Sequence, residues 1–221
     1  MAVALDKFRR RVGGDPPGDF ADLERWERRI QRGMLLGLAM GVVAGVLTAL
    51  GGRFAPAQVS AAADPYLYLA VVILAGRLSL GFGWALVNCT LTAFGVLISR
   101  ILCAAVIGGQ SPLDGGVAEA LNRLLFLMVL SGLLASVTRL RDVWGDVAAG
   151  GLALLFLVDV VDGCLGRMNG AVLPVWEWAA GAAVVLGVAC ALFLRPTFRC
   201  RLNASGIAFG AAAVYTLAAA L

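Results

Sequence analysis

The sequence predicts an all-α polytopic membrane protein, a bundle of about seven transmembrane helices preceded by a cytoplasmic amphipathic helix. Of its 221 residues, 61% are hydrophobic and only 14% are charged, whereas a soluble domain has about 45–50% apolar and about 25% charged residues. The mean hydropathy is +0.89. Seven apolar stretches also approach the roughly 20 residues with which a helix crosses a hydrocarbon core about 30 Å thick.

The composition excludes several kinds of chemistry. The sequence contains no His, which excludes His-based proton relays, catalytic triads with His, and zinc sites with His ligands. The only lysine, Lys7, lies outside the predicted helices, so a retinal or pyridoxal Schiff base is excluded as well. The five Cys are scattered and form no short paired motif. We therefore expect no bound cofactor.

Residues 1–33 form the first predicted region, a cytoplasmic basic segment that contains eight of the 18 basic residues. Residues 19–32 are predicted to be an amphipathic helix, because acidic residues stand at its start, arginines at its end, and apolar residues recur at helical spacing. Two interpretations stay open for this helix. It either lies on anionic lipid headgroups or is a lead-in that fixes the topology, and the second is the simpler.

Residues 34–221 form the second predicted region, the transmembrane bundle. The spans are expected at about 34–50, 65–80, 83–107, 118–137, 147–164, 172–194 and 205–221. The second is the weakest, because its clean apolar run covers only residues 66–75 and Arg77 follows. Two alternatives stay open for this segment: it crosses the membrane fully, or it crosses only in part.

Charge asymmetry favours seven spans. With the N-terminus in the cytoplasm, seven spans leave only Arg53 and Arg167 among the outer connections, and all other basic residues outside the apolar spans lie inside, as the positive-inside rule requires. The prediction is therefore a multi-pass protein of the plasma membrane, of bacterial type, with its C-terminus outside. Its expected partner is the lipid bilayer, and no nucleic acid is expected.

Glycines recur every four residues along the first span, at Gly33, Gly37, Gly41 and Gly45. They lie on one helix face, where a second helix can approach closely, as in small-xxx-small interfaces. The spacing does not tell whether that second helix belongs to the same chain or to a second copy in a homodimer.

Charged residues inside the spans are the candidate functional residues, because ionisable groups in a membrane are costly. The expected cluster lies in the outer half of the bundle and comprises Arg100, Glu119, Asn122, Arg123, Asp159, Asp162 and Glu177. Arg100 and Asp159 lie at similar depth and are predicted to pair. The cluster either lines an outward-facing cavity for a small solute or neutralises itself and fixes helix register.

A polar run in the third span, Asn88, Thr90 and Thr92, allows the same two interpretations. The three side chains extend the cavity inward, or the hydroxyl groups bond back to their own helix, which is the more common arrangement.

Residues 159–167, Asp-Val-Val-Asp-Gly-Cys-Leu-Gly-Arg, resemble the first half of the CDP-alcohol phosphotransferase signature, D-x-x-D-G-x-x-A-R. The resemblance implies Asp159 and Asp162 as ligands of divalent metals and Arg167 beside a nucleotide. Gly166 replaces the usual Ala. The second half of the signature, with two further Asp, does not follow, since Glu177 is the only later acidic residue. The half signature makes a divergent enzyme of this type only an alternative.

Three classes of function follow from these observations. A non-enzymatic membrane protein of structural or accessory type is favoured, because no complete chemical motif occurs. A small-solute transporter or binding subunit that uses the charged cluster is the second class, and the divergent phosphotransferase is the third. Gly145-Asp146 in the connection before the fifth span is interpreted as an ordinary helix start.

Overall fold

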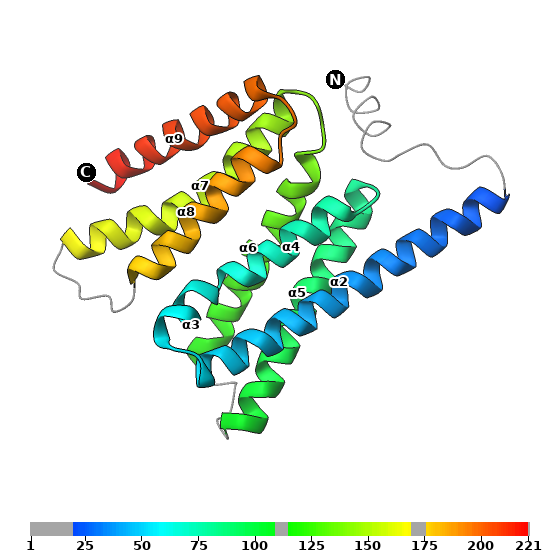
Figure 1. The fold of residues 1–221 in the computed structure, drawn as a ribbon, viewed down its shortest axis with the longest axis horizontal. Coiled ribbons are helices and arrows are strands. Elements are labelled where there is room, and N and C mark those ends of the chain that lie inside the picture. Colours follow the sequence, from blue (N-terminus) through cyan, green and yellow to red (C-terminus); the bar gives the residue numbers. More distant parts are fainter. Residues whose placement is uncertain (1–19, 109–114, 169–175, 221) are drawn as a thin grey trace. The chain divides into compact units, whose positions relative to one another are not determined.

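A computed structural model of the chain describes residues 20–108, 115–168 and 176–220. In these ranges the chain forms helices and no β-strand. The helices are α2 (Phe20–Phe54), α3 (Ala57–Ala63), α4 (Tyr66–Leu78), α5 (Phe82–Gly108), α6 (Gly115–Val137), α7 (Val143–Met168), α8 (Trp176–Phe193) and α9 (Phe198–Ala220) (Figure 1).

The predicted all-α membrane bundle is confirmed. Within the described ranges, six segments are long and apolar enough to cross a membrane, namely α2, α3 together with α4, α5, α6, α7 and α8. Helix α9 adds a seventh long helix of 23 residues. Some parts of the predictions lie outside the described residues: residues 1–19 of the basic segment, residues 172–175 of the sixth span, residue 221 of the seventh span, and the side chain of Arg167.

Helix α2 differs from the prediction because it is continuous. The sequence suggested a separate amphipathic helix before a first span at residues 34–50, but one helix of 35 residues runs from Phe20 to Phe54. Between Arg32 and Arg53 it contains 20 uncharged residues, which span about 30 Å at 1.5 Å per residue. The uncharged part of α2 therefore matches the hydrocarbon core, and the basic part continues it beyond the membrane.

The second predicted span consists of two helices. Helix α4 has 13 residues, and its length of about 20 Å is less than the thickness of the hydrocarbon core. Helix α3 adds 7 residues, and the cis peptide bond between Asp64 and Pro65 lies between the two helices. The segment reaches the length of a span only when α3 is included.

The described residues form two compact units. The first unit contains those up to Val46 and those from Val71 to Ser136, and the second contains Leu47–Ala70 and the residues from Val137 onward. The first unit is therefore built from most of α2, most of α4, α5 and α6. The second is built from α3, α7, α8 and α9, with the first turn of α4.

In the first unit, α2 packs on α5 through a glycine seam formed by Gly37, Gly41 and Gly45. A methyl group added at Gly41 would overlap the backbone carbonyl of Thr92, and one added at Gly45 would overlap Ser99. A methyl group at Gly33 would meet nothing within 4 Å. The seam therefore packs within the chain, and Gly33 takes no part in it.

Helices α4 and α6 of the first unit also approach each other through glycines. A methyl group at Gly76 would overlap the backbone of Gly132. The thiol of the buried Cys89 on α5 donates to the carbonyl oxygen of Val72 on α4, with the two atoms 3.8 Å apart. Small residues thus allow three helix backbones to come together, which is the usual solution where lipid supplies no hydrophobic driving force.

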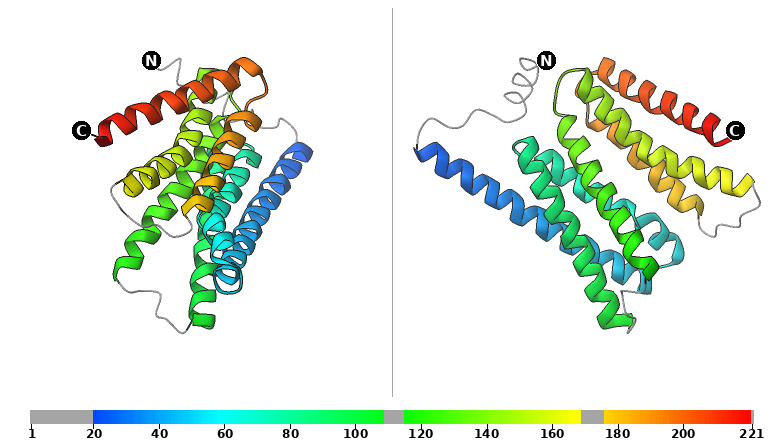
Figure 2. Two further views of the ribbon diagram at one scale, coloured as in Figure 1. Left: turned by 60° about the vertical axis from the view of Figure 1, so that its left-hand side comes forward. Right: turned by 180° about the vertical axis from the view of Figure 1, so that it is seen from behind.

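In the second unit, α7 is the central helix, and both α8 and α9 lie along it (Figures 1 and 2). Its contact with α9 passes through Gly150, whose added methyl group would lie 2.9 Å from the carbonyl oxygen of Ala204. Ala153, Ala191 and Ala208, one from each of the three helices, form a buried cluster. Small side chains again set the distance between the helices.

The glycine seam gives the first testable prediction. Gly41→Ala should lower the melting temperature in detergent, because the added methyl group meets backbone that cannot move aside, and such overpacking costs about 1–3 kcal/mol. Gly33→Ala is the matched control. It should leave stability unchanged or raise it by up to about 1 kcal/mol, since Ala is the better helix former. Equal melting temperatures for the two variants would contradict the packing described here.

Candidate functional site

The predicted charged cluster is divided between the two units. Arg100, Glu119, Asn122 and Arg123 belong to the first unit, and Asp159, Asp162 and Glu177 belong to the second. The predicted pair of Arg100 with Asp159 joins residues of different units and stays a prediction. Inside each unit, hydrogen bonds and ion pairs define the surroundings of these residues.

In the second unit, two tyrosines bind the aspartates of α7. The hydroxyl group of Tyr66, at the start of α4, donates to Asp159 Oδ2 at 2.6 Å. The hydroxyl group of Tyr215, on α9, donates to Asp162 Oδ1 at 2.7 Å. The Tyr66 ring also packs against Phe156 with 6.2 Å between ring centroids. Each aspartate is exposed, and each has a phenolic donor from another helix.

In the first unit, Arg123 pairs with Glu119 one turn earlier on α6, at 2.6 Å between nitrogen and oxygen. The two side chains are 80% and 70% exposed, and exposed pairs of this spacing contribute only about 0.3–0.5 kcal/mol in water. Asn122 beside them is exposed as well. The half-buried Arg100 also takes part in an interaction.

The polar run on α5 bonds mainly to its own helix. Thr90 donates to the carbonyl oxygen of Leu86, and Thr92 donates to that of Asn88, both at 2.7 Å. The Asn88 amide group bonds to the end of α4, donating to the Ala75 carbonyl oxygen at 3.1 Å and to Ser79 Oγ at 3.2 Å. These groups therefore stabilise helix ends and helix contacts.

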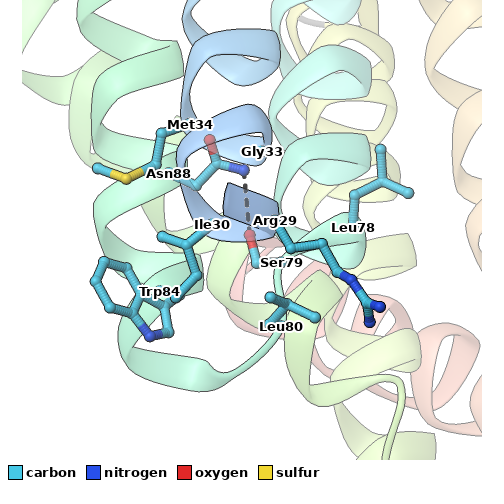
Figure 3. A pocket seen from close by; sticks show the side chains of 9 residues that line it. All are labelled: Arg29, Ile30, Gly33, Met34, Leu78, Ser79, Leu80, Trp84 and Asn88. Atoms are coloured by element: carbon cyan, nitrogen blue, oxygen red, sulfur yellow. Dashed lines mark hydrogen bonds between the residues drawn. The ribbon is translucent and has the colours of Figure 1, made fainter. Parts of the chain in front are cut away.

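A small recess lies beside Asn88, between α2, α5 and the end of α4 (Figure 3). Its volume of about 20 Å³ has room for about one water molecule, whereas small-molecule sites usually measure about 300–1,000 Å³. Near the recess, Trp84 contacts the Trp26 ring edge to face, with centroids 6.0 Å apart. The recess is lined by Arg29, Ile30, Gly33, Met34, Leu78, Ser79, Leu80, Trp84 and Asn88.

Of the charged groups in the described residues, Arg195 in the connection between α8 and α9 is the most deeply buried. Only 1% of it is exposed, and its guanidinium group forms an ion pair with Asp146 in the first turn of α7. Its terminal nitrogens also donate to the carbonyl oxygens of Thr138 at 2.9 Å, Leu140 at 2.5 Å and Asp142 at 3.4 Å. We call this arrangement the Arg195 site.

Neighbouring residues are fitted to the Arg195 site. A methyl group added at Gly145 would overlap the Arg195 guanidinium group and the Leu140 carbonyl oxygen, so only glycine fits there. The amide group of Asn203, on α9, donates to the second carboxylate oxygen of Asp146 at 3.2 Å. Asp146 also lies at the N-terminus of α7, where the helix dipole favours negative charge. The Gly145-Asp146 helix start therefore supplies the carboxylate of a buried ion pair with Arg195.

Sequence reasoning missed the residues that make these contacts. Arg195 entered only as part of the topology argument, Asp146 as an ordinary helix start, and Tyr66 and Tyr215 not at all. A signal was present, because both tyrosines lie near the predicted outer ends of their spans, at the depth of Asp159 and Asp162. Comparing depth for all polar groups, rather than for charged groups alone, would have found them.

The half signature lies on α7, which continues through it as a regular helix to Met168. Its Gly163 is in close contact with the Trp176 indole ring, which a methyl group at that position would overlap. Among the described residues, no three His, Cys, Asp or Glu side chains gather in a group that could hold a metal ion. The two aspartates hydrogen bond to tyrosines, and the geometry adds no further ligand to the half signature.

In comparisons with known proteins, no family model, no curated protein and no solved structure matches the chain.

The Arg195 site gives the second testable prediction. Arg195→Ala should destabilise the protein by about 3–5 kcal/mol, because it leaves the buried carboxylate of Asp146 without its cation. Arg199→Ala is the matched control, since Arg199 is exposed only four residues further along. The measurement is thermal unfolding in detergent. If the two variants have the same melting temperature, the ion pair contributes nothing to stability.

The two tyrosine contacts give the third prediction. A double-mutant cycle of Tyr66→Phe with Asp159→Ala should show a coupling of about 1 kcal/mol, because this hydrogen bond is part-buried and alanine removes its acceptor. The matched cycle of Tyr215→Phe with Asp162→Ala should show almost none, because that bond is exposed to solvent or lipid headgroups. A larger coupling in the second cycle would show that the exposure of these bonds does not govern their strength.

Proposed function

We propose that the protein is a non-enzymatic integral membrane protein with a structural or accessory role. The Arg195 site is the observation that carries this proposal. Its guanidinium group, the most deeply buried cation described, is bound to one carboxylate and three backbone carbonyl oxygens of its own chain. Such a group organises helices and is not exposed to act on a ligand.

The other described polar groups support the same proposal. The exposed aspartates of α7 bind tyrosine hydroxyl groups, Arg123 pairs with its own helix, and the recess beside Asn88 is too small for a solute. Within the described part of the chain, these polar groups bond to one another and organise helix contacts.

The proposed topology places the N-terminus in the cytoplasm and the C-terminus outside. The distribution of charge in the second unit supports this topology, because basic and acidic residues lie at opposite ends of its helices. Its basic end, at the start of α7 and the connection between α8 and α9, has exposed Arg139, Arg141 and Arg199. Its acidic end, where α7 ends and α8 begins, has exposed Asp159, Asp162 and Glu177. By the positive-inside rule the basic end faces the cytoplasm.

Cation binding at the acidic end is the second candidate function. An open groove between α3 and α8 is lined by Glu177 and the exposed indole ring of Trp178, with Ala62, Gly181, Ala182 and Val185. A carboxylate beside an aromatic face is a favourable place for an organic cation. This groove is the feature that favours a solute-binding subunit.

The fourth prediction tests the proposed function by deletion and complementation. If the role is structural or accessory, deletion of the gene should lower the abundance of at least one other membrane protein in the quantified membrane proteome. The double variant Asp159→Asn and Asp162→Asn should restore that abundance as well as the wild type does. An amide still accepts the tyrosine hydrogen bonds, and a structural role does not need the negative charges.

Three outcomes would contradict the proposal. The double variant could reach wild-type abundance and melting temperature and still fail to complement, which would show that the carboxylate charges act on a ligand. Failure of Glu177→Gln alone, with the fold intact, would favour cation binding at the groove. If deletion changes no other membrane protein, the accessory role is wrong.

A further inference from the structure

An apolar groove opens between α8 and α9, with α7 as its floor. Its volume is about 100 Å³, and the buried alanines Ala153, Ala191 and Ala208 lie at its base. The walls are larger side chains that remain exposed, namely Leu192 at 41% and Phe209 at 66%. The groove is therefore open to the surface on which lipid chains lie.

The groove follows from the way the three helices pack. Both α8 and α9 lie along α7 and make little contact with each other (Figures 1 and 2). Gly187 on α8 lines the gap between them. An apolar space of this kind stays dry, and one of about 150 Å³ holds a benzene-sized molecule. The volume here fits a segment of hydrocarbon chain and is too small for a polar solute.

Arg201 lies at the mouth of the groove. It is one helical turn before Ser205, a lining residue, and therefore on the same face of α9, about 6 Å along the helix axis. Its Nε–H donates to the carbonyl oxygen of Arg195 at 2.9 Å, which fixes the side chain against the connection from α8. That hydrogen bond involves only the Nε atom of Arg201. The two terminal amino groups of an arginine can donate side by side to two oxygens of one phosphate group.

Charge at this end of the second unit favours an anion. Arg139, Arg141 and Arg199 are exposed around the same helix ends, and a basic residue near an anionic membrane surface contributes about 1 kcal/mol. We propose that the groove between α8 and α9 binds one acyl chain of an anionic glycerophospholipid, whose phosphate is bound by Arg201. The groove supplies affinity for the chain, and Arg201 supplies the preference for a negative headgroup.

The fifth prediction tests this lipid site in nanodiscs that contain equal amounts of phosphatidylglycerol and phosphatidylcholine with identical acyl chains. Native mass spectrometry of the released protein should show phosphatidylglycerol enriched among the retained lipids. Arg201→Met should reduce that enrichment about fivefold, the equivalent of about 1 kcal/mol. Arg199→Met is the control. It should lower the enrichment less than Arg201→Met does, because Arg199 lies six residues before Ser205, on another face of α9, and adds only to the general surface charge.

A second pair of variants tests the groove without disturbing Arg201. Gly187→Leu should abolish retention of both lipids, because its side chain fills the groove. Its Cβ meets Ala153 and Phe156 at ordinary contact distances of 3.5 Å, so the variant should fold. Gly181→Leu on the same helix, where Cβ meets nothing within 4 Å, should behave like the wild type.

The site would be disproved by unchanged lipid retention in Gly187→Leu, or by unchanged enrichment in Arg201→Met. Arg201→Lys keeps the charge, so retained enrichment in that variant, against its loss in Arg201→Met, would show that the charge itself is required. If every variant including both controls loses lipid equally, retention is nonspecific and the proposal is wrong.

Discussion

The second unit depends on the burial of one arginine. A guanidinium group that is only 1% exposed must find acceptors for its hydrogen bonds within the protein, because water does not reach it. The terminal nitrogens of Arg195 find them by drawing together the connection before α7, the first turn of α7, and the connection between α8 and α9. Asn203 adds the first part of α9 through Asp146. One side chain therefore determines how three helix ends meet, which explains why Gly145 has no room for a side chain.

The fold could be predicted because hydropathy and helix length are constraints on individual segments. The bounds predicted for the third and fourth spans, 83–107 and 118–137, differ by only a few residues from α5 and α6. Continuity between helices was harder to predict. The charges at Arg28, Arg29 and Arg32 suggested a boundary in α2, but a helix can leave the membrane without a break when no Pro or Gly pair interrupts it.

The candidate site was only partly predictable. The charged residues in the spans can be found from the sequence, because ionisable groups are rare in membrane helices, where their burial costs free energy. Their partners cannot be found in this way, because they depend on which helices are neighbours. Tyr66 reaches Asp159 across 93 positions of the chain, and no periodicity in either helix contains that information. The glycine seam shows the same limit, because the spacing predicted close packing and the structure supplied α5 as the neighbour.

The continuity of α2 has a mechanical consequence. Residues 20–32 extend about 20 Å beyond the uncharged stretch, and no flexible joint separates them from the glycine seam on α5. A force applied to residues 20–32 would therefore tilt or rotate the whole of α2 and so act on the glycine seam. At the seam, Gly41 lies against backbone, and interfaces packed this tightly respond by stepping between discrete arrangements rather than by yielding gradually. Helix α2 thus connects its basic segment rigidly to the glycine seam within the membrane.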